Sequence, residues 1–289
     1  MHKLLTDQAG REMLLLGNEA IARGALEAGV AFASTYPGTP SSEISANFFQ
    51  IARETDLYFE YSTNEKVAME VAAAAANAGV RSMCIMKHVG LNVAADPLMT
   101  LAYVGVKAGM VIVTADDPFM FSSQNEQDNR YYGRLAGLPM LEPSSVAEAK
   151  EMTAYAFELS EELQQPVLFR TTTRINHSTA VVTTGPLKAR RPKGGFVKDP
   201  LNYVPVPVVA RKLHARLLER LEAAEKLAAQ SPFNFSSGGG DWGIVCNGVS
   251  HGYVCDALRD LGIRDRVRVL RIGFSHPLPA GLVTGFLKA

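Results

Sequence analysis

Short apolar runs alternate with longer segments of helical period along the first part of the chain. The apolar runs have the length of buried strands, and the segments between them place apolar residues on one helical face. Strands are predicted at 13–17, 30–36, 58–61, 81–87, 109–114, 140–141 and 166–171. Helices are predicted at 18–29, 41–55, 62–79, 131–136 and 145–163, and one more starts at Asp96. This alternation predicts right-handed βαβ units, and therefore an α/β fold with a parallel sheet and helices on both faces.

The pattern changes after the last of these strands. Residues 184–207 are rich in Gly, Pro, Lys and Arg without a period, which predicts a linker whose basic residues are solvated. A long helix is predicted at 206–229, and the glycines of 236–240 predict a flexible hinge. A second α/β unit follows, with strands at 242–246 and 267–272, a helix at 253–261, and a helix start at Ala280. Because two strands do not make a stable sheet of this kind, we expect this unit to be truncated or to dock on something outside these residues.

These changes divide the chain into three predicted parts. The first is a domain at 1–185, the second is a linker with its long helix at 186–240, and the third is the start of another α/β domain at 241–289. Several common motifs are missing from all three: the phosphate loop, the G-x-G-x-x-G fingerprint, the nucleophile elbow and the H-E-x-x-H zinc motif. A cofactor held by one of those motifs is therefore not expected here.

Composition and charge narrow the function classes. Hydrophobic residues make up 47% of the chain, as in folded proteins, and 29 basic residues balance 29 acidic ones, so no nucleic-acid partner is expected. No apolar run reaches the roughly 20 residues that span a bilayer, and no secretory signal opens the chain, so no membrane association is expected. Cys84, Cys246 and Cys255 have neither paired nor metal-binding spacing, which predicts free thiols, no metal site and a cytoplasmic location.

Glu65 stands where the predicted strand 58–61 ends and a helix begins. Ser62 and Glu65 have capping-box spacing, so one interpretation is that the carboxylate only satisfies amides of its own helix. The other interpretation is functional, because ligands gather at the carboxyl ends of strands in parallel α/β sheets. The helix that follows contains five consecutive alanines at 72–76, and so little bulk allows close packing against another backbone or subunit.

The turn at 37–43 is a second candidate site. Two prolines and a glycine break the preceding strand and expose Thr39, Ser41 and Ser42 at the start of a helix. Free amides and the helix dipole favour an anion at such a position. The alternative is that one of the serines caps the helix and has no other role.

Two further loops follow strand ends. His88 lies in the predicted loop 88–92, where it is either a titrating group or an exposed or hydrogen-bonded histidine. The polar segment 125–134 contains Arg130 and Arg134. Guanidinium groups clamp carboxylates bidentately, so this segment either binds an acidic ligand or pairs with its own acidic residues.

A resemblance to a known family is carried by three segments, 35–43 (TYPGTPSSE), 63–66 (TNEK) and 132–137 (YGRLAG). They resemble the pyrimidine-binding domain of the thiamine diphosphate-dependent 2-oxoacid:ferredoxin oxidoreductases. Segments 87–92 (KHVGLN) and 126–130 (EQDNR) are most similar to the alpha subunits of indolepyruvate ferredoxin oxidoreductases. The resemblance assigns 1–185 to the pyrimidine-binding domain, and residues from Asp241 onward resemble the start of a transketolase C-terminal-like domain.

The resemblance implies roles for individual residues. A family glutamate at the position of Glu65 hydrogen-bonds the aminopyrimidine ring of thiamine diphosphate, so Glu65 is the predicted catalytic and cofactor-binding residue. His88, Gly90 and Asn92 would flank the same ring.

The same resemblance implies a substrate site. Thr39 would lie near the carboxylate of the substrate, and Arg134 would be its counter-charge. Arg134 matches the family better than Arg130 does, because the family arginine precedes a short run of small residues like 135–137.

The implied reaction is the oxidative decarboxylation of an arylpyruvate such as indolepyruvate with coenzyme A, giving an acyl-CoA and reduced ferredoxin. The family binds magnesium through a Gly-Asp-Gly…Asn motif and [4Fe-4S] clusters through a cysteine-rich segment, and neither is found in these 289 residues. We therefore expect an N-terminal fragment that is inactive alone. The complete protein is expected to pair with a small beta subunit and to form a homodimer of alpha subunits.

Two other functions stay open. One is a non-oxidative thiamine diphosphate-dependent 2-oxoacid decarboxylase. The other is a non-catalytic assembly domain, in which the alanine helix and segment 105–109 form only a subunit contact. The sequence does not determine which 2-oxo acid is used.

Overall fold

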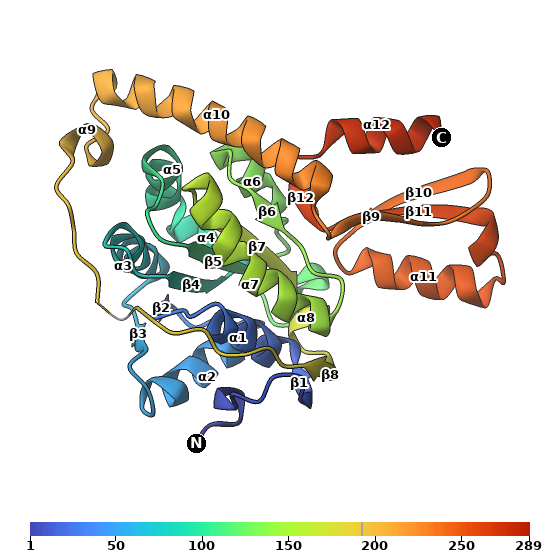
Figure 1. Cartoon of the computed structure of the whole chain (residues 1–289), viewed down its shortest axis with the longest axis horizontal. Coiled ribbons are helices and arrows are strands. Elements are labelled where there is room, and N and C mark those ends of the chain that lie inside the picture. Colours follow the sequence, from blue (N-terminus) through green and yellow to red (C-terminus); the bar gives the residue numbers. More distant parts are fainter. Residues whose placement is uncertain (192) are drawn as a thin grey trace.

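A seven-stranded sheet forms the centre of the protein in a computed structural model that describes residues 1–191 and 193–289 (Figure 1). Residue 192, in the predicted linker, lies outside the described residues. The strands are β2 (Phe32–Thr35), β3 (Tyr58–Tyr61), β4 (Ser82–Lys87), β5 (Met110–Asp116), β6 (Met140–Leu141), β7 (Val167–Thr172) and β12 (Phe274–His276). Their order is β12-β6-β7-β5-β4-β2-β3. Neighbouring strands are parallel except for β12, which is antiparallel to β6.

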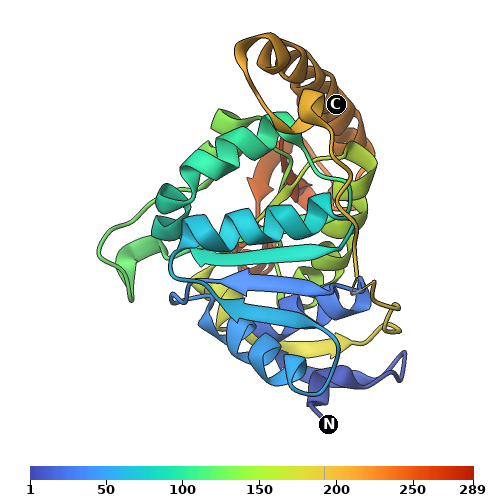
Figure 2. The same ribbon diagram turned by 90° about the vertical axis from the view of Figure 1, so that its left-hand side faces the viewer.

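Helices cover both faces of this sheet. One face carries α1 (Gly17–Glu27), α2 (Ser42–Ala52) and α7 (Val146–Leu163), and the other carries α3 (Glu65–Asn77), α4 (His88–Val93), α5 (Ala95–Val104) and α6 (Arg130–Ala136). Figure 2 shows α3 and α5 on the side of the sheet opposite to α1 and α2. Alternate residues of β5 enter the two cores, Val111 and Val113 on one side and Met110 and Ile112 on the other. The predicted parallel α/β fold is confirmed.

The predicted first domain closes with a strand that the sequence pattern did not identify. β8 (Thr179–Thr183) pairs antiparallel with β1 (Glu12–Leu16) in a separate two-stranded sheet. The pairing brings the end of this region beside its beginning. The other short helical elements are η1 (Lys3–Leu5), η2 (Pro118–Met120), α8 (Thr173–Asn176), α9 (Pro200–Tyr203) and η3 (Arg264–Arg266).

The second unit has three strands rather than the two that were predicted. They are β9 (Asn234–Gly238), β10 (Trp242–Asn247) and β11 (Val267–Ile272), in the order β10-β11-β9. The predicted hinge at 236–240 is therefore wrong, because β9 hydrogen-bonds antiparallel to β11 through most of that segment. An exposed edge strand does not need apolar side chains, and this strand contains serine and glycine. It therefore lacks the apolar pattern from which strands were predicted. α11 (Ser250–Asp260) and α12 (Ala280–Lys288) pack on this sheet through separate apolar clusters.

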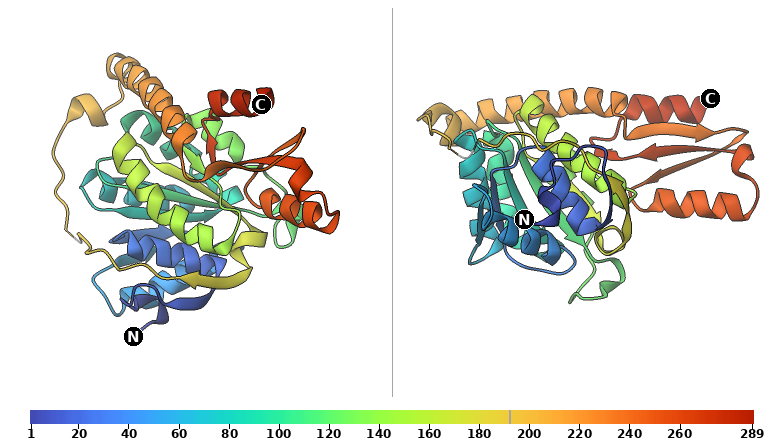
Figure 3. Two further views of the ribbon diagram at one scale, coloured as in Figure 1. Left: turned by 45° about the vertical axis from the view of Figure 1, so that its right-hand side comes forward. Right: turned by 60° about the horizontal axis from the view of Figure 1, so that its bottom comes forward.

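The two units are joined by a long helix and by one shared strand. The predicted long helix is α10 (Pro207–Gln230), which buries Leu213 and Leu217. Figure 3 shows α10 extending along the molecule towards the second unit. From that unit, β12 returns to the edge of the large sheet. Asn234 holds this junction, because its side chain donates to Ala228 O and Phe274 O and accepts from the backbone amides of residues 273 and 274. The second unit thus docks on the first unit of the same chain.

Candidate active site

Glu65 is the first residue of α3, directly after β3. The predicted capping box is wrong, because the helix begins two residues later than that box requires. Asn64 is the N-cap, and its side-chain oxygen accepts a hydrogen bond from Val67 N at 3.0 Å. Ser62 instead donates its hydroxyl to Glu60 Oε1 at 2.8 Å. The Glu65 carboxylate is thereby released from its own helix, and it makes no hydrogen bond or ion pair within the described residues.

The Glu65 side chain lies against Gly90. A Cβ placed on Gly90 would be 2.6 Å from Glu65 Oε1 and 2.9 Å from Cδ, which is shorter than van der Waals contact. Gly90 lies in α4, so the predicted loop at 88–92 is wrong: β4 passes directly into a helix there. Helical φ/ψ values do not require glycine, so the close approach of the carboxylate is the reason for it. Glu65 is half-buried, and it faces the start of α4 at the carboxyl end of the parallel strands.

His88 is fully buried, unlike an ordinary loop histidine. Its Nε2 lies 3.2 Å from both Asn125 O and Asn125 Oδ1, and its backbone carbonyl accepts from the side-chain amides of Gln127 and Asn129. Its Nδ1 has no hydrogen-bond partner in the described part of the chain. Residues 117–129 form a segment that we call the 117–129 loop. Gln127 and Asn129 attach this loop to the start of α4.

Asn92 lies one helical turn beyond His88 and is exposed. Its side-chain amide pairs with that of Gln127 through hydrogen bonds of 2.8 and 2.9 Å, and Tyr132 donates its hydroxyl to Asn92 Oδ1 at 2.7 Å. The Asn92 amide is thus engaged by the protein itself, whereas the Glu65 carboxylate is not.

The turn that carries Thr39 packs on the same end of the sheet. Gly38 lies so close to Lys87 that a Cβ on it would be 2.8 Å from the Lys87 Cβ. Asn18 donates to Pro40 O at 2.8 Å and fixes the turn from α1. Ser41 precedes α2 but does not cap it through its side chain, because its hydroxyl donates to Gly38 O. Plain serine capping therefore does not explain this turn.

The two arginines of the 125–134 segment differ in their surroundings. Arg130 is held by Asp128, with Nη2 at 2.6 Å from Oδ2, so it pairs with an acid of its own loop. Arg134 is exposed and makes no ion pair within the described residues. It lines a cavity of ≈ 330 Å³ that also includes His276 and does not include Thr39. Within the described residues, Thr39 and Arg134 therefore do not line this cavity together.

Comparisons with known proteins identify the family of this chain. The family model of the pyruvate flavodoxin/ferredoxin oxidoreductase thiamine diphosphate-binding domain matches residues 23–203. The chain belongs to this family. It is 52% identical to indolepyruvate oxidoreductase subunit IorA of Methanothermobacter thermautotrophicus, over 100% of this chain and 47% of that protein. It is 50% identical to the subunit of the same name from Thermococcus kodakarensis, over 98% of this chain and 45% of that protein.

Solved structures show the same fold. The 2-oxoglutarate:ferredoxin oxidoreductase from Magnetococcus marinus matches 95% of this chain and 56% of its own, with a TM-score of 0.76 at 16% identity. A split-gene transketolase, described as an inactive beta4 tetramer, matches 95% of this chain and 76% of its own with a TM-score of 0.58. The family model and the IorA relatives confirm the predicted family, and the solved structures confirm the fold. The chain spans about half the length of the curated relatives it matches.

Sequence reasoning missed one part of this oxidoreductase-family domain, a buried charge network under the 117–129 loop. Arg170, at the end of β7, binds Asp116 Oδ2 at 2.7 Å and Glu142 Oε2 at 2.5 Å. Burial raises the pKa of Asp116, although Arg170 opposes this shift. Asp116 also accepts from the backbone amide of Asn129 at 3.0 Å, so the network supports the loop that holds α4. In the sequence, Asp116 indicates only the end of a strand, and Arg170 lies within an apolar run. Neither position indicates a buried ion pair.

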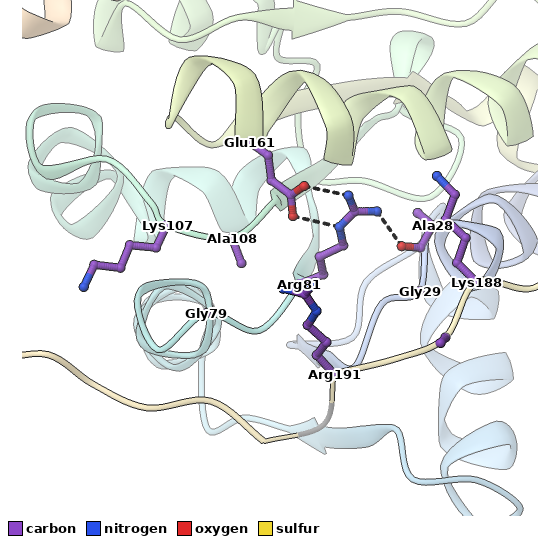
Figure 4. Close-up of a pocket in the computed structure, with 10 residues that line it drawn as sticks. Ala28, Gly29, Gly79, Arg81, Lys107, Ala108, Glu161, Lys188 and Arg191 are labelled. Atoms are coloured by element: carbon purple, nitrogen blue, oxygen red, sulfur yellow. Dashed lines mark hydrogen bonds and ion pairs between the residues drawn. The ribbon is translucent and has the colours of Figure 1, made fainter.

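A basic cavity of ≈ 470 Å³ lies at the amino ends of the strands, away from Glu65 (Figure 4). Arg81 crosses it, bound to Glu161 Oε2 at 2.6 Å and to Ala28 O at 2.6 Å. The linker forms its outer wall, and Lys188 and Arg190 make ion pairs with Glu158 and Asp56. The Lys188 side chain stays 54% exposed, as predicted for a solvated linker, whereas that of Arg190 is only 14% exposed in its ion pair. These ion pairs fasten the linker to α7 and to the segment between α2 and β3.

Among residues 1–191 and 193–289, no three His, Cys, Asp or Glu side chains are grouped so that they could hold a metal ion. Within the same residues, no helix combines the length and the apolar content that crossing a membrane requires.

Proposed function

We propose that the complete protein containing this chain oxidatively decarboxylates arylpyruvates such as indolepyruvate, using coenzyme A and reducing ferredoxin. The observation that carries the proposal is the half-buried Glu65 carboxylate, which rests on Gly90 at the strand ends and is bound by no other described group. Relatives named indolepyruvate oxidoreductase, about half identical to this chain, support the choice of substrate.

The residues around Glu65 fit the aminopyrimidine part of thiamine diphosphate. When bound, this cofactor supplies the electron sink for decarboxylation. Glu65 would exchange a proton with a ring nitrogen, because its carboxylate has no competing donor within the described chain. Gly90 leaves the carboxylate the space that any other side chain would fill. His88 and Asn92 would flank the ring from α4, held in place by the 117–129 loop.

The carboxylate of the 2-oxo acid would be held by Thr39 and Arg134. Arg134 is available for this role because no carboxylate of the described residues pairs with it, whereas Arg130 is already bound to Asp128. Thr39 lies in a turn that is held by a hydrogen bond from Asn18 and by packing against Lys87. The remaining half of the protein, or a second subunit, would bring the two sides of this site together.

The proposal includes partners and cofactors outside this chain. Magnesium and [4Fe-4S] clusters would be bound by the part of the protein that the chain does not span. A small beta subunit and a second alpha subunit would complete the enzyme, with ferredoxin as electron acceptor. The three cysteines are free thiols, which supports a reducing cytoplasm as its location.

The test is reduction of a viologen dye by the complete enzyme, prepared without oxygen and supplied with thiamine diphosphate, magnesium and coenzyme A. Aryl 2-oxo acids should support reduction, and Glu65→Gln should lower it by about 100-fold or more, the range for loss of a general acid–base group. Glu70→Gln, an exposed glutamate on the same helix, is the matched control and should be unaffected. Release of aldehyde and CO₂ without dye reduction would favour the non-oxidative decarboxylase. Full activity of Glu65→Gln would favour the assembly domain.

A further inference from the structure

A second cavity opens beside the candidate active site, at the carboxyl ends of β5 and β7. Its volume is ≈ 540 Å³, within the range of small-molecule sites. Phe119 and Phe121 of the 117–129 loop line one side, and Val249 and Tyr253 of the second unit line the other. The cavity therefore lies between the two units, where ligands of α/β proteins commonly bind.

The aromatic side of the cavity is held in a strained backbone. Phe119 and Met120 have φ values of 67° and 55°, a backbone conformation that residues other than glycine rarely adopt. Asp117 braces the segment, accepting from Ser123 Oγ at 2.6 Å and from Thr173 Oγ1 at 2.7 Å. The result is that Phe119 is 77% exposed. Strain that displays an aromatic ring to solvent indicates a binding role rather than a packing role.

The opposite side combines a cation with an aromatic ring. Arg174 donates from Nε to the Tyr253 hydroxyl at 2.7 Å, and its guanidinium carbon lies 5.6 Å from the centre of the Tyr253 ring. Within the described residues Arg174 forms no ion pair with a carboxylate. A guanidinium group attracts the face of an aromatic ring, and most strongly that of an indole. The lining thus offers aromatic walls and a cation to a flat aromatic ligand.

The same loop forms a wall of the candidate active site. On its other side, Ser122 O accepts from Lys87 Nζ at 2.8 Å, and Asn125 contacts His88. β4 and β5 are neighbouring strands, so their ends are about 5 Å apart. The 117–129 loop therefore borders both the start of α4 and the cavity.

We propose that this cavity binds the aromatic ring of the arylpyruvate and so selects aryl 2-oxo acids over small ones. The inference rests on the proposed function and adds the residues that would set its specificity, Phe121, Arg174 and Tyr253. A competing explanation is that a partner subunit covers the exposed phenylalanines, and the test separates the two.

The experiment measures kcat/KM of the complete enzyme for indolepyruvate and for pyruvate in Tyr253→Ala and Phe121→Ala. The ratio of the two values should fall by about 10- to 100-fold in each variant, since a lost hydrophobic contact in a pocket has an effect of this order. Arg174→Gln should lower the ratio by about 3- to 10-fold. Phe49→Ala, which removes a similarly exposed aromatic ring on α2 away from this cavity, is the control and should keep the wild-type ratio.

Binding of indole-3-acetate, followed by calorimetry on the same complete proteins, separates this inference from the proposed function. Binding that weakens in Tyr253→Ala but not in Phe49→Ala would support the cavity even if no 2-oxo acid were oxidised. Wild-type turnover of indolepyruvate with an unchanged substrate ratio in all three cavity variants would overturn the cavity and leave the proposed function intact. Equal losses for both substrates together with impaired subunit assembly, measured by gel filtration, would overturn it in favour of an interface.

Discussion

Replacement of Gly90 by alanine tests the contact on which the candidate active site depends. The added methyl group would lie 2.6 Å from Glu65 Oε1, 2.7 Å from Cγ and 2.9 Å from Cδ. All three atoms belong to one side chain, and no backbone atom is among the nearest neighbours. The glutamate must therefore turn away from α4, while the main chain of both helices stays in place.

This geometry separates the effect on stability from the effect on function. Alanine is favoured over glycine inside a helix by about 1 kcal/mol, and moderate overpacking costs about 1–3 kcal/mol, so the net loss of unfolding free energy should be about 0–2 kcal/mol. Restoring normal contact requires the carboxylate to move by about 1 Å, and a misplacement of that size can lower turnover by about 100-fold. Gly90→Ala should thus stay folded, bind thiamine diphosphate weakly and turn over slowly.

The assay compares thermal unfolding, calorimetric titration with thiamine diphosphate and dye reduction in the complete enzyme. Gly252→Ala is the matched control, because Gly252 lies in α11 with no atom within 4 Å of an added Cβ. That variant should keep both binding and turnover. Wild-type turnover by Gly90→Ala would refute the reasoning, because it would mean that the position of Glu65 against α4 does not matter.

Two further predictions concern charge. Arg170→Met should lower the unfolding free energy, measured in urea, by about 3–5 kcal/mol, because it leaves buried Asp116 and Glu142 without their cation. Arg130→Met, at an exposed ion pair, is the control and should lower it by about 0–1 kcal/mol. Equally small losses in the two variants would contradict this prediction. The hydrogen bond from Arg81 lowers the pKa of Glu161 in the folded protein. This ion pair therefore contributes its full stability above the ordinary glutamate pKa of about 4.3, and the contribution is lost as the pH falls through the lowered pKa. The stability difference between wild type and Glu161→Gln should therefore shrink from pH 7 to pH 3, and a constant difference would refute it.

The parallel sheet could be predicted because its strands are buried on both faces. The segment Met110–Asp116, for example, is buried at every residue and begins with four apolar residues, and the helices between such strands repeat at a regular distance. β8 and β9 could not be found in this way. Both are exposed, and most of their side chains are polar or small, so only pairing with β1 and β11 makes them strands. Their partner strands lie far away in the sequence, and a local pattern of apolar residues does not predict such pairing.

The candidate site was only partly predictable for a related reason. Glu65, Gly90 and His88 each follow a strand, so topology alone brings them to one edge of the sheet. The support beneath them depends on contacts across the fold. Arg170 reaches Asp116 and Glu142 from a strand between theirs, and a charge inside an apolar run has no sequence pattern that names its partners.

The start of α3 excludes the capping interpretation of Glu65, and a shift of two residues in the helix start is what excludes it. If Ser62 were the cap, Glu65 would be the third helical residue and its carboxylate would reach back to the cap amide. With Asn64 as the cap, Glu65 is the first helical residue and has no such amide within reach. Boundaries of one or two residues are beyond the resolution of sequence patterns, because Ser, Thr and Asn are all good caps. The segment Ser62-Thr63-Asn64 contains all three, and Asn64 is the residue that caps α3, which leaves the Glu65 carboxylate without a bond to its own helix.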